Sequence, residues 1–112
     1  MPIAHCIVSP TALNSAAHGS DPVENWAQLS EESADEMTIT LVKREQQYGK
    51  AYHIMALLYL PSTWSEDKAI NLKLSLATAL ANHFSMPVSE VFVIARTLES
   101  GEAVENGEIV NW

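Results

Sequence analysis

The chain has 112 residues, of which 47% are hydrophobic, so we expect one globular domain that covers residues 1–112. Its formal net charge of -8, with only six lysines and arginines, argues against binding to nucleic acid or to an anionic membrane surface. Neither a signal-peptide pattern nor a run of about 20 apolar residues is present, so we expect a cytoplasmic protein with no membrane span.

The first half of the chain predicts a strand, a helix and a second strand. The helix is expected to start at Asp21-Pro22, because an aspartate caps free backbone amides and a proline fits the first helical position. In chain order, we expect a strand at 3–8, a polar loop at 9–20, a helix from 22 to about 33, and a strand at 37–42. The apolar stripe predicted for this helix consists of Val23, Trp26, Ala27 and Leu29.

The second half predicts the same order of elements. The nearly continuous apolar run 52–60 (YHIMALLYL) is typical of a central strand covered on both faces. Ser65 suits the N-cap of a long helix, which is expected to end at Met86-Pro87. We expect this helix to be covered on two sides, one with Leu72, Leu76, Ala79, Leu80 and His83, the other with Ile70, Leu74, Ala77 and Ala81.

The end of the chain predicts one more strand and a hairpin. The strand is expected at 91–97, and Asn106-Gly107 suits a type I′ turn between two short arms. The order is therefore two similar strand-helix-strand repeats followed by a C-terminal hairpin. A ferredoxin-like fold has the same order of elements and is an alternative at this point.

The stretch 65–97 (SEDKAINLKLSLATALANHFSMPVSEVFVIART) resembles the repeat unit of the tautomerase superfamily, typified by 4-oxalocrotonate tautomerase. The resemblance lies in the Ser-acid-acid-Lys helix start, the Ala/Leu-rich helix, the proline bend and the valine-rich strand. The opening MPIAHCIV is similar to the first strand of that family, and the chain length is similar to its fused, two-repeat members, which include macrophage migration inhibitory factor. The segment 9–36 shows no match. The resemblance implies an α+β fold, with two β-α-β repeats in a four-stranded mixed sheet and two helices on one face, and assembly as a homotrimer.

The same resemblance makes Pro2 the candidate catalytic residue. If Met1 is removed, the Pro2 nitrogen is a secondary amine that can act as a general base on a small enol or keto acid. While Met1 is present, this nitrogen is an amide and cannot take a proton. The residue pattern alone leaves a structural role open, because a proline is well tolerated as the first residue of a strand.

The two substrate-binding arginines of the family are not matched. Their positions hold Trp64 and Phe92 in the second repeat, and Ala12 and Thr38 in the first. Binding of a dicarboxylate is therefore in question.

Other residues are candidates for substrate binding. Arg96 lies four residues after Phe92, on the same strand face, and is our candidate cation; Lys43 and Arg44 are further candidates. By the resemblance, the apolar Leu60 and Phe92 are expected around Pro2, in a pocket shared with a neighbouring subunit. The predicted substrate-binding residues are thus Arg96, Phe92 and Leu60.

We expect no metal and no cofactor. The four histidines share no ligand spacing, and no phosphate-binding glycine loop is present. Cys6 lies in an apolar run, where a free cysteine usually fills the core. Two hypotheses remain: a tautomerase (an isomerase) acting on a small enol or keto acid, or a non-catalytic trimeric binding or structural protein of the same fold. The MPIA opening favours the first and the unmatched arginines favour the second.

Overall fold

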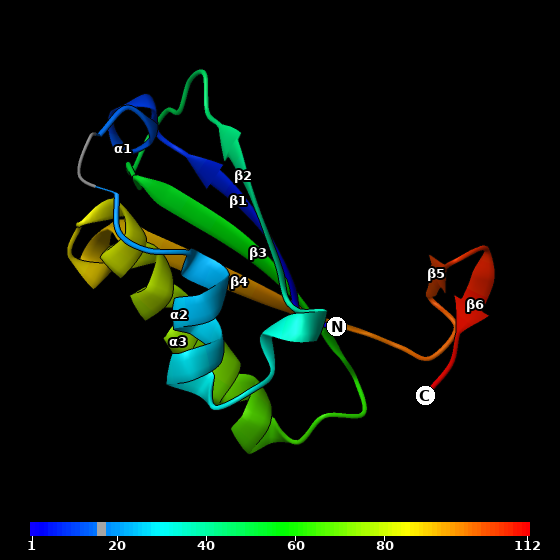
Figure 1. The fold of residues 1–112 in the computed structure, drawn as a ribbon. Coiled ribbons are helices and arrows are strands. Elements are labelled where there is room, and N and C mark those ends of the chain that lie inside the picture. The colour runs from blue at the N-terminus through cyan, green and yellow to red at the C-terminus, as the bar shows by residue number, and fades with distance from the viewer. Residues whose placement is uncertain (16–17) are drawn as a thin grey trace.

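The computed structural model describes residues 1–15 and 18–112, and its centre is a four-stranded sheet (Figure 1). The strands are β1 (Ile3–Val8), β2 (Thr38–Lys43), β3 (Ile54–Pro61) and β4 (Val91–Leu98), in the order β2-β1-β3-β4. β1 is parallel to β2, β3 is parallel to β4, and the two central strands, β1 and β3, are antiparallel. This is the mixed sheet of two β-α-β repeats expected from the sequence.

Two helices, α2 (Pro22–Ser30) and α3 (Glu66–Phe84), lie on one face of this sheet (Figure 1). Both start as predicted: the Asp21 side chain accepts a hydrogen bond from the Val23 amide at 2.8 Å, and the Ser65 hydroxyl accepts one from the Lys68 amide at 3.2 Å. Three short helical elements lie between the strands and long helices: α1 (Pro10–Leu13) and the 3₁₀ helices η1 (Ala34–Glu36) and η2 (Val88–Glu90). The helix α1 lies in the predicted loop 9–20, and residues 16–17 of that loop fall outside the described residues.

The core lies between the helices and the sheet. Alternate residues of β1 and β3 face the helices and are buried, as the period of two requires. The large, fully buried side chains include Trp26 of α2, Leu58 and Leu60 of β3, and Leu72, Leu76, Leu80 and Phe84 of α3.

Some residues of α2 and α3 that were predicted to be buried are exposed in the structure. α2 ends at Ser30, because Glu31 takes the left-handed conformation (φ 60°) and ends the helix; Leu29 is 42% exposed and Ser30 is buried in its place. On α3, Ile70 and Leu74 are 43% and 67% exposed, so the second covered side predicted for this helix is wrong at these two positions, whereas Ala81 is buried as predicted. The sheet and α2 together cover one side of α3 and leave its outer side bare.

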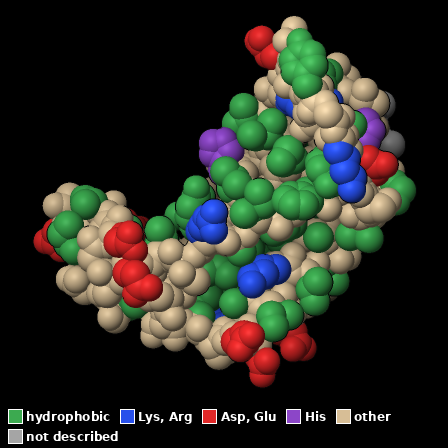
Figure 2. Space-filling model, turned by 180° about the vertical axis from the view of Figure 1, so that it is seen from behind, with side chains coloured by type: hydrophobic (Ala, Val, Ile, Leu, Met, Phe, Trp, Pro, Cys, Tyr) green, Lys and Arg blue, Asp and Glu red, His purple; other side chains and the backbone are tan. Residues whose placement is uncertain are grey.

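The second face of the sheet is not covered by any element in the described part of the chain. Alternate residues of the strands point to it, among them the exposed side chains of Ile3, Ile7, Val42 and Phe92. Figure 2, seen from behind, shows hydrophobic side chains gathered across this face. β3 is therefore central, as predicted, but its Met55, Leu57 and Tyr59 are only half-buried, so it is covered on one face and not on both.

The C-terminal hairpin stands apart from the body of the molecule (Figure 1). It consists of β5 (Ala103–Glu105) and β6 (Glu108–Val110), which form a separate two-stranded sheet. Asn106 and Gly107 both have positive φ (55° and 76°), as a type I′ turn requires, so the predicted turn is confirmed. The Trp112 indole donates a hydrogen bond to the Ser62 hydroxyl at 3.2 Å and holds the end of the chain near the start of α3.

Candidate active site

Pro2 lies at the start of a central strand and is buried. Its carbonyl oxygen accepts a hydrogen bond from the Thr38 amide at 3.1 Å. Ile3 pairs with Thr38 on one side and with Tyr59 on the other, so continuing this register by one residue puts Pro2 beside Met37 and Leu60. The sequence candidates Pro2 and Leu60 are therefore neighbours at one end of the sheet.

Met1 precedes Pro2 and is half-buried. It lines a groove of about 320 Å³ between the start of β1 and the C-terminal hairpin, together with Ile3, Asp35, Glu36, Thr38, Ala103, Val104, Glu105 and Val110. Burial is the main cause that lowers the pKa of the Met1 amino group; the Glu36 carboxylate raises this pKa, the Lys68 ammonium lowers it and Glu105 raises it. The N-terminal amine thus lies in surroundings that favour its neutral form.

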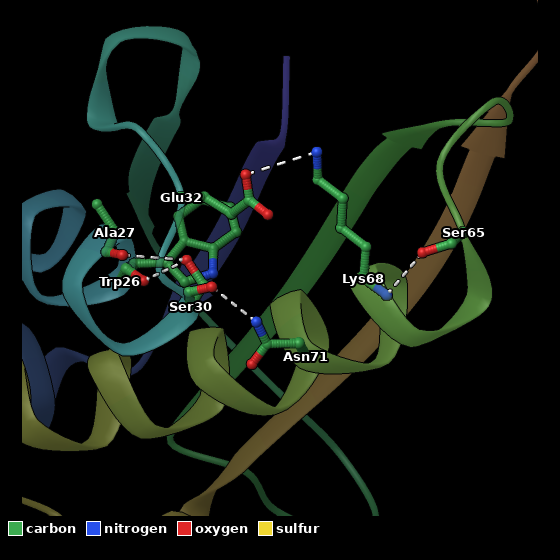
Figure 3. A network of polar contacts seen from close by, with 7 residues as sticks. All are labelled: Trp26, Ala27, Ser30, Glu32, Ser65, Lys68 and Asn71. Atoms are coloured by element: carbon green, nitrogen blue, oxygen red, sulfur yellow. Dashed lines mark hydrogen bonds and ion pairs between the residues drawn. The ribbon is translucent and has the colours of Figure 1, made fainter.

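Lys68 is the cation that acts on this amine. It stands in the first turn of α3, with its Nζ 3.9 Å from the centre of the Trp64 ring. The same Nζ lies 3.5 Å from Oε2 of Glu32 (Figure 3). The ring and the carboxylate both restrain the long side chain, because a cation is attracted to an aromatic face and to an opposite charge. Our reading of the sequence missed Lys68, although its signal was present in the Ser-acid-acid-Lys helix start and in Trp64 four residues before it.

Glu32 is positioned for this ion pair by contacts between α2 and α3. The Trp26 indole donates to the Leu72 carbonyl at 3.1 Å, and the Asn71 amide donates to the Ser30 carbonyl at 2.7 Å. Figure 3 shows Asn71 and Lys68 on α3 reaching across to the end of α2, where Ser30 and Glu32 lie. The two repeats therefore share this part of the site.

The other predicted substrate-binding residues lie further away. Arg96 pairs with Tyr59 in the sheet, on the far side of β3 from Pro2. Phe92 pairs with Met55, so it lies away from Pro2 by the length of β3 from Met55 to Leu60, roughly 16 Å at about 3.3 Å per residue. Within one chain Phe92 cannot line a pocket at Pro2, and its predicted role depends on a neighbouring subunit.

Lys43 and Arg44 also lie at the end of the sheet away from Pro2, since β2 ends there. The Arg44 guanidinium donates to the Tyr52 carbonyl at 2.6 Å and to Oε1 of Gln47 at 2.9 Å. These bonds give Arg44 a structural role in the loop between β2 and β3, so neither cation serves Pro2 of its own chain.

Cys6 faces the helices, as Pro2 does, but it is not a nucleophile at neutral pH. It is fully buried, and burial raises the pKa of its thiol to about 12. Over residues 1–15 and 18–112, no three His, Cys, Asp or Glu side chains are grouped so that they could hold a metal ion. Within the same ranges, no helix has the length and apolar character needed to cross a membrane.

Neither a protein-family model nor a curated protein matches the sequence. Solved structures do match over nearly the whole chain. The F6 fused 4-OT wild type asymmetric trimer has a TM-score of 0.75 at 10% identity, covering 96% of this chain and 94% of that chain. N1, a member of the cis-3-chloroacrylic acid dehalogenase family, has a TM-score of 0.71 at 9% identity, covering 96% and 82%. Macrophage migration inhibitory factor from Oncomelania hupensis has a TM-score of 0.70 at 7% identity, covering 98% and 82%. The fold implied by the sequence is therefore confirmed, and at these identities the likeness concerns the fold alone.

Proposed function

We propose that this chain, whose fold is that of the tautomerase superfamily, is a keto–enol tautomerase in which Pro2, freed by removal of Met1, is the general base. The observation that carries the proposal is the partial burial of the N-terminal amine, which is the main cause that lowers its pKa; the Lys68 ammonium lowers the pKa further, and Glu36 and Glu105 oppose the shift without reversing it. After removal of Met1, the Pro2 nitrogen would be the N-terminal amine in the same surroundings, within about 4 Å of the present one. We expect its pKa to be lowered for the same reasons, which makes it a usable base near neutral pH.

The proposed reaction is ketonisation of a small enol acid. The neutral Pro2 amine takes the proton of the enol hydroxyl, and the resulting ammonium returns a proton to the neighbouring carbon, so the enol becomes a ketone without any other reactant. Negative charge develops on oxygen between these two transfers. Lys68, already restrained by Trp64 and Glu32, is the group we assign to stabilise that charge.

The proposed pocket combines residues of one chain with residues of a neighbour. Leu60, beside Pro2, supplies an apolar wall from the same chain. Phe92 lies on the uncovered sheet face, so we propose that a neighbouring subunit brings its own Phe92 to the Pro2 pocket. Arg96 would attract the carboxylate of the substrate from the far side of β3, over a distance of roughly 10 Å, which is about one Debye length.

This pocket requires an oligomer, and we propose a homotrimer. In a monomer, the apolar face of the sheet would stay in contact with water, and so would Val104 and Ile109 of the separate hairpin. A neighbouring subunit that covers this apolar surface would stabilise the protein. The similar fused 4-OT structure is a trimer. Sedimentation velocity at micromolar concentration should give a trimer, and a monomer would contradict the proposal.

The activity is tested on protein whose intact mass shows that Met1 is absent. We expect this protein to accelerate the ketonisation of phenylenolpyruvate, followed by its ultraviolet absorbance. The variant Pro2→Ala keeps a free amine but loses the secondary nitrogen, and it should be slower. Equal rates in both proteins, or no rate in either, would reject the enzyme and leave a non-catalytic trimer of the same fold.

A further inference from the structure

The groove at the N-terminus is lined by acidic side chains. Asp35, Glu36 and Glu105 contribute three carboxylates to its lining, and among the described residues no lysine or arginine lines it. Lys68 acts on the terminal amine from outside this lining, and its ammonium is already paired with Glu32. Carboxylates repel an anionic ligand, so the enol acid proposed above needs a further cation in direct contact.

A lysine without an acidic partner lies in the loop between β2 and β3, at the end of the sheet away from the N-terminus (Figure 1). The Lys50 ammonium is 5.4 Å from the centre of the Tyr52 ring, and the centre of the Phe92 ring is 5.0 Å from that same ring centre. In the part of the chain that the structure describes, Lys50 makes no ion pair. We call Lys50, Tyr52 and Phe92 the Tyr52 cluster.

Hydrogen bonds hold the loop that carries this cluster. The side-chain oxygen of Gln47 accepts from the Tyr52 amide at 2.9 Å and from the Arg44 guanidinium at 2.9 Å. The same guanidinium donates to the Tyr52 carbonyl at 2.6 Å. The backbone of Tyr52 is thus fixed through both its amide and its carbonyl, with its ring against Phe92. A subunit that brings Phe92 to its neighbour therefore brings Lys50 as well.

We propose that Lys50 of a neighbouring subunit completes the Pro2 pocket and binds the carboxylate of the substrate. This inference rests on the proposed function, in which the neighbour's Phe92 reaches that pocket. The ammonium would pair with the carboxylate, and the rings of Tyr52 and Phe92 would pack against the apolar body of the substrate. The cluster offers one cation and two rings, so the substrate class is an aryl-bearing enol acid with a single carboxylate.

The opposite charges of the two surfaces support this contact. An acidic groove at one end of the chain and a lysine at the other attract each other when two chains pack end to end. Asp35, Glu36 and Glu105 are exposed and screened by water, so an ammonium in direct contact with the substrate outweighs them. A second carboxylate on the substrate would face these acids without a cation of its own, which disfavours dicarboxylates.

The contact can be tested without any catalysis. In the double variant Glu36→Cys/Lys50→Cys, a short bis-maleimide should join chains into covalent oligomers on a denaturing gel. The length of β2 keeps positions 36 and 50 of one chain roughly 20 Å apart at about 3.3 Å per residue, so the link must be between chains. The matched control, Glu36→Cys/Lys73→Cys, has its second thiol at an exposed position of α3, and the buried Cys6 does not react. No link in the first variant, or equal linking in both, would overturn the contact.

The role of Lys50 in binding is measured by calorimetry with phenylpyruvate, the keto product, on protein without Met1. Lys50→Gln should weaken phenylpyruvate binding about five-fold, which corresponds to about 1 kcal/mol. It should not change the binding of phenylacetone, which has the ring and the ketone but no carboxylate. Lys73→Gln is the matched control and should leave both affinities unchanged. Phenylpyruvate that does not bind, an equal loss for both ligands, or an equal loss in Lys73→Gln would reject the role of Lys50.

Activity in mixed trimers separates this inference from the proposed function. When Lys50→Gln and Pro2→Ala subunits are combined, an intact Pro2 can meet an intact Lys50 of its neighbour. Activity per intact Pro2 should therefore rise above that of Lys50→Gln alone, and no rise would contradict a role across the interface. If the chains link and phenylpyruvate binds as expected but the parent protein is inactive, the binding site stands and the enzyme is rejected. If the parent protein is active but the chains do not link, Pro2 keeps its role and Lys50 loses its own.

Discussion

Trp26 joins the two repeats, and replacing it with phenylalanine should measurably weaken the fold. Its ring is fully buried between α2 and α3, and its indole nitrogen donates to the Leu72 carbonyl. Trp26→Phe removes that hydrogen bond, worth about 0.5–1.5 kcal/mol, while the Leu72 carbonyl still accepts from the Ser75 hydroxyl and is not left unpaired. The smaller ring also leaves unfilled space, at a further cost of about 1 kcal/mol. We expect the free energy of unfolding to fall by about 2 kcal/mol.

The assay is urea denaturation followed by circular dichroism, with the slope m unchanged and the midpoint lowered. Leu29→Ala is the matched control on the same helix, because Leu29 is largely outside the core and alanine is a good helix former; its effect should be below about 0.5 kcal/mol. If Trp26→Phe changes the stability by no more than this control, the contact between the repeats contributes much less than its burial implies. If Leu29→Ala is as damaging as Trp26→Phe, Leu29 contributes to the core as much as Trp26 does, which would contradict the exposure of Leu29.

Three further predictions concern the site, the thiol and the assembly. Lys68→Gln removes a charge that lowers the pKa of the N-terminal amine, so in protein without Met1 the basic form should appear at higher pH; an unchanged pH profile of kcat/KM would exclude Lys68 from the site. The Cys6 thiol ionises at about pH 9 when unfolded and at about pH 12 when folded, so the free energy of unfolding should fall as the pH rises through this range; Cys6→Ala should lack this part of the fall, and an identical pH dependence in both proteins would contradict the assigned burial. Val104→Asp and Ile109→Asp should each lower the oligomeric state in sedimentation if the hairpin packs on a neighbouring subunit, and an unaffected trimer would show that it does not.

The local features of the fold were predictable from the sequence because they depend on neighbouring residues. Asp21 and Ser65 start their helices through their own side chains, and Asn106-Gly107 makes its turn through its own backbone. The exposed sides of the helices were not predictable. Whether Leu29 or Ser30 is buried depends on where α3 lies against α2, which no periodicity within α2 reveals.

Some residues of the candidate site were likewise predictable from the sequence, and others depend on the tertiary fold. The position of Pro2 at a strand start was visible in the opening residues. Lys68 was only partly visible: the Ser-acid-acid-Lys helix start and Trp64 marked its position, but its ion pair with Glu32, which comes from the other repeat, depends on the tertiary fold. Phe92 lies far from Pro2 of its own chain for a topological reason: β4 runs parallel to β3 and antiparallel to β1, so the start of β4 lies at the opposite end of the sheet from Pro2. The prediction that Phe92 lines the Pro2 pocket therefore depends on a neighbouring subunit.

The antiparallel centre of the sheet has a consequence for the number of sites. The two repeats start at opposite ends of the sheet, so Ile54 begins β3 where Val8 ends β1. A chain has only one N-terminus, and the position before Ile54 is His53, whose nitrogen is an ordinary peptide amide and whose ring is hydrogen-bonded to Ser9 at 2.7 Å. The second end of the sheet therefore cannot repeat an amine-based chemistry. The residues at that end, including Arg44 and Phe92, do not have to form a site around an N-terminal amine. They can instead stabilise the loop or the fold, or contact a neighbouring subunit.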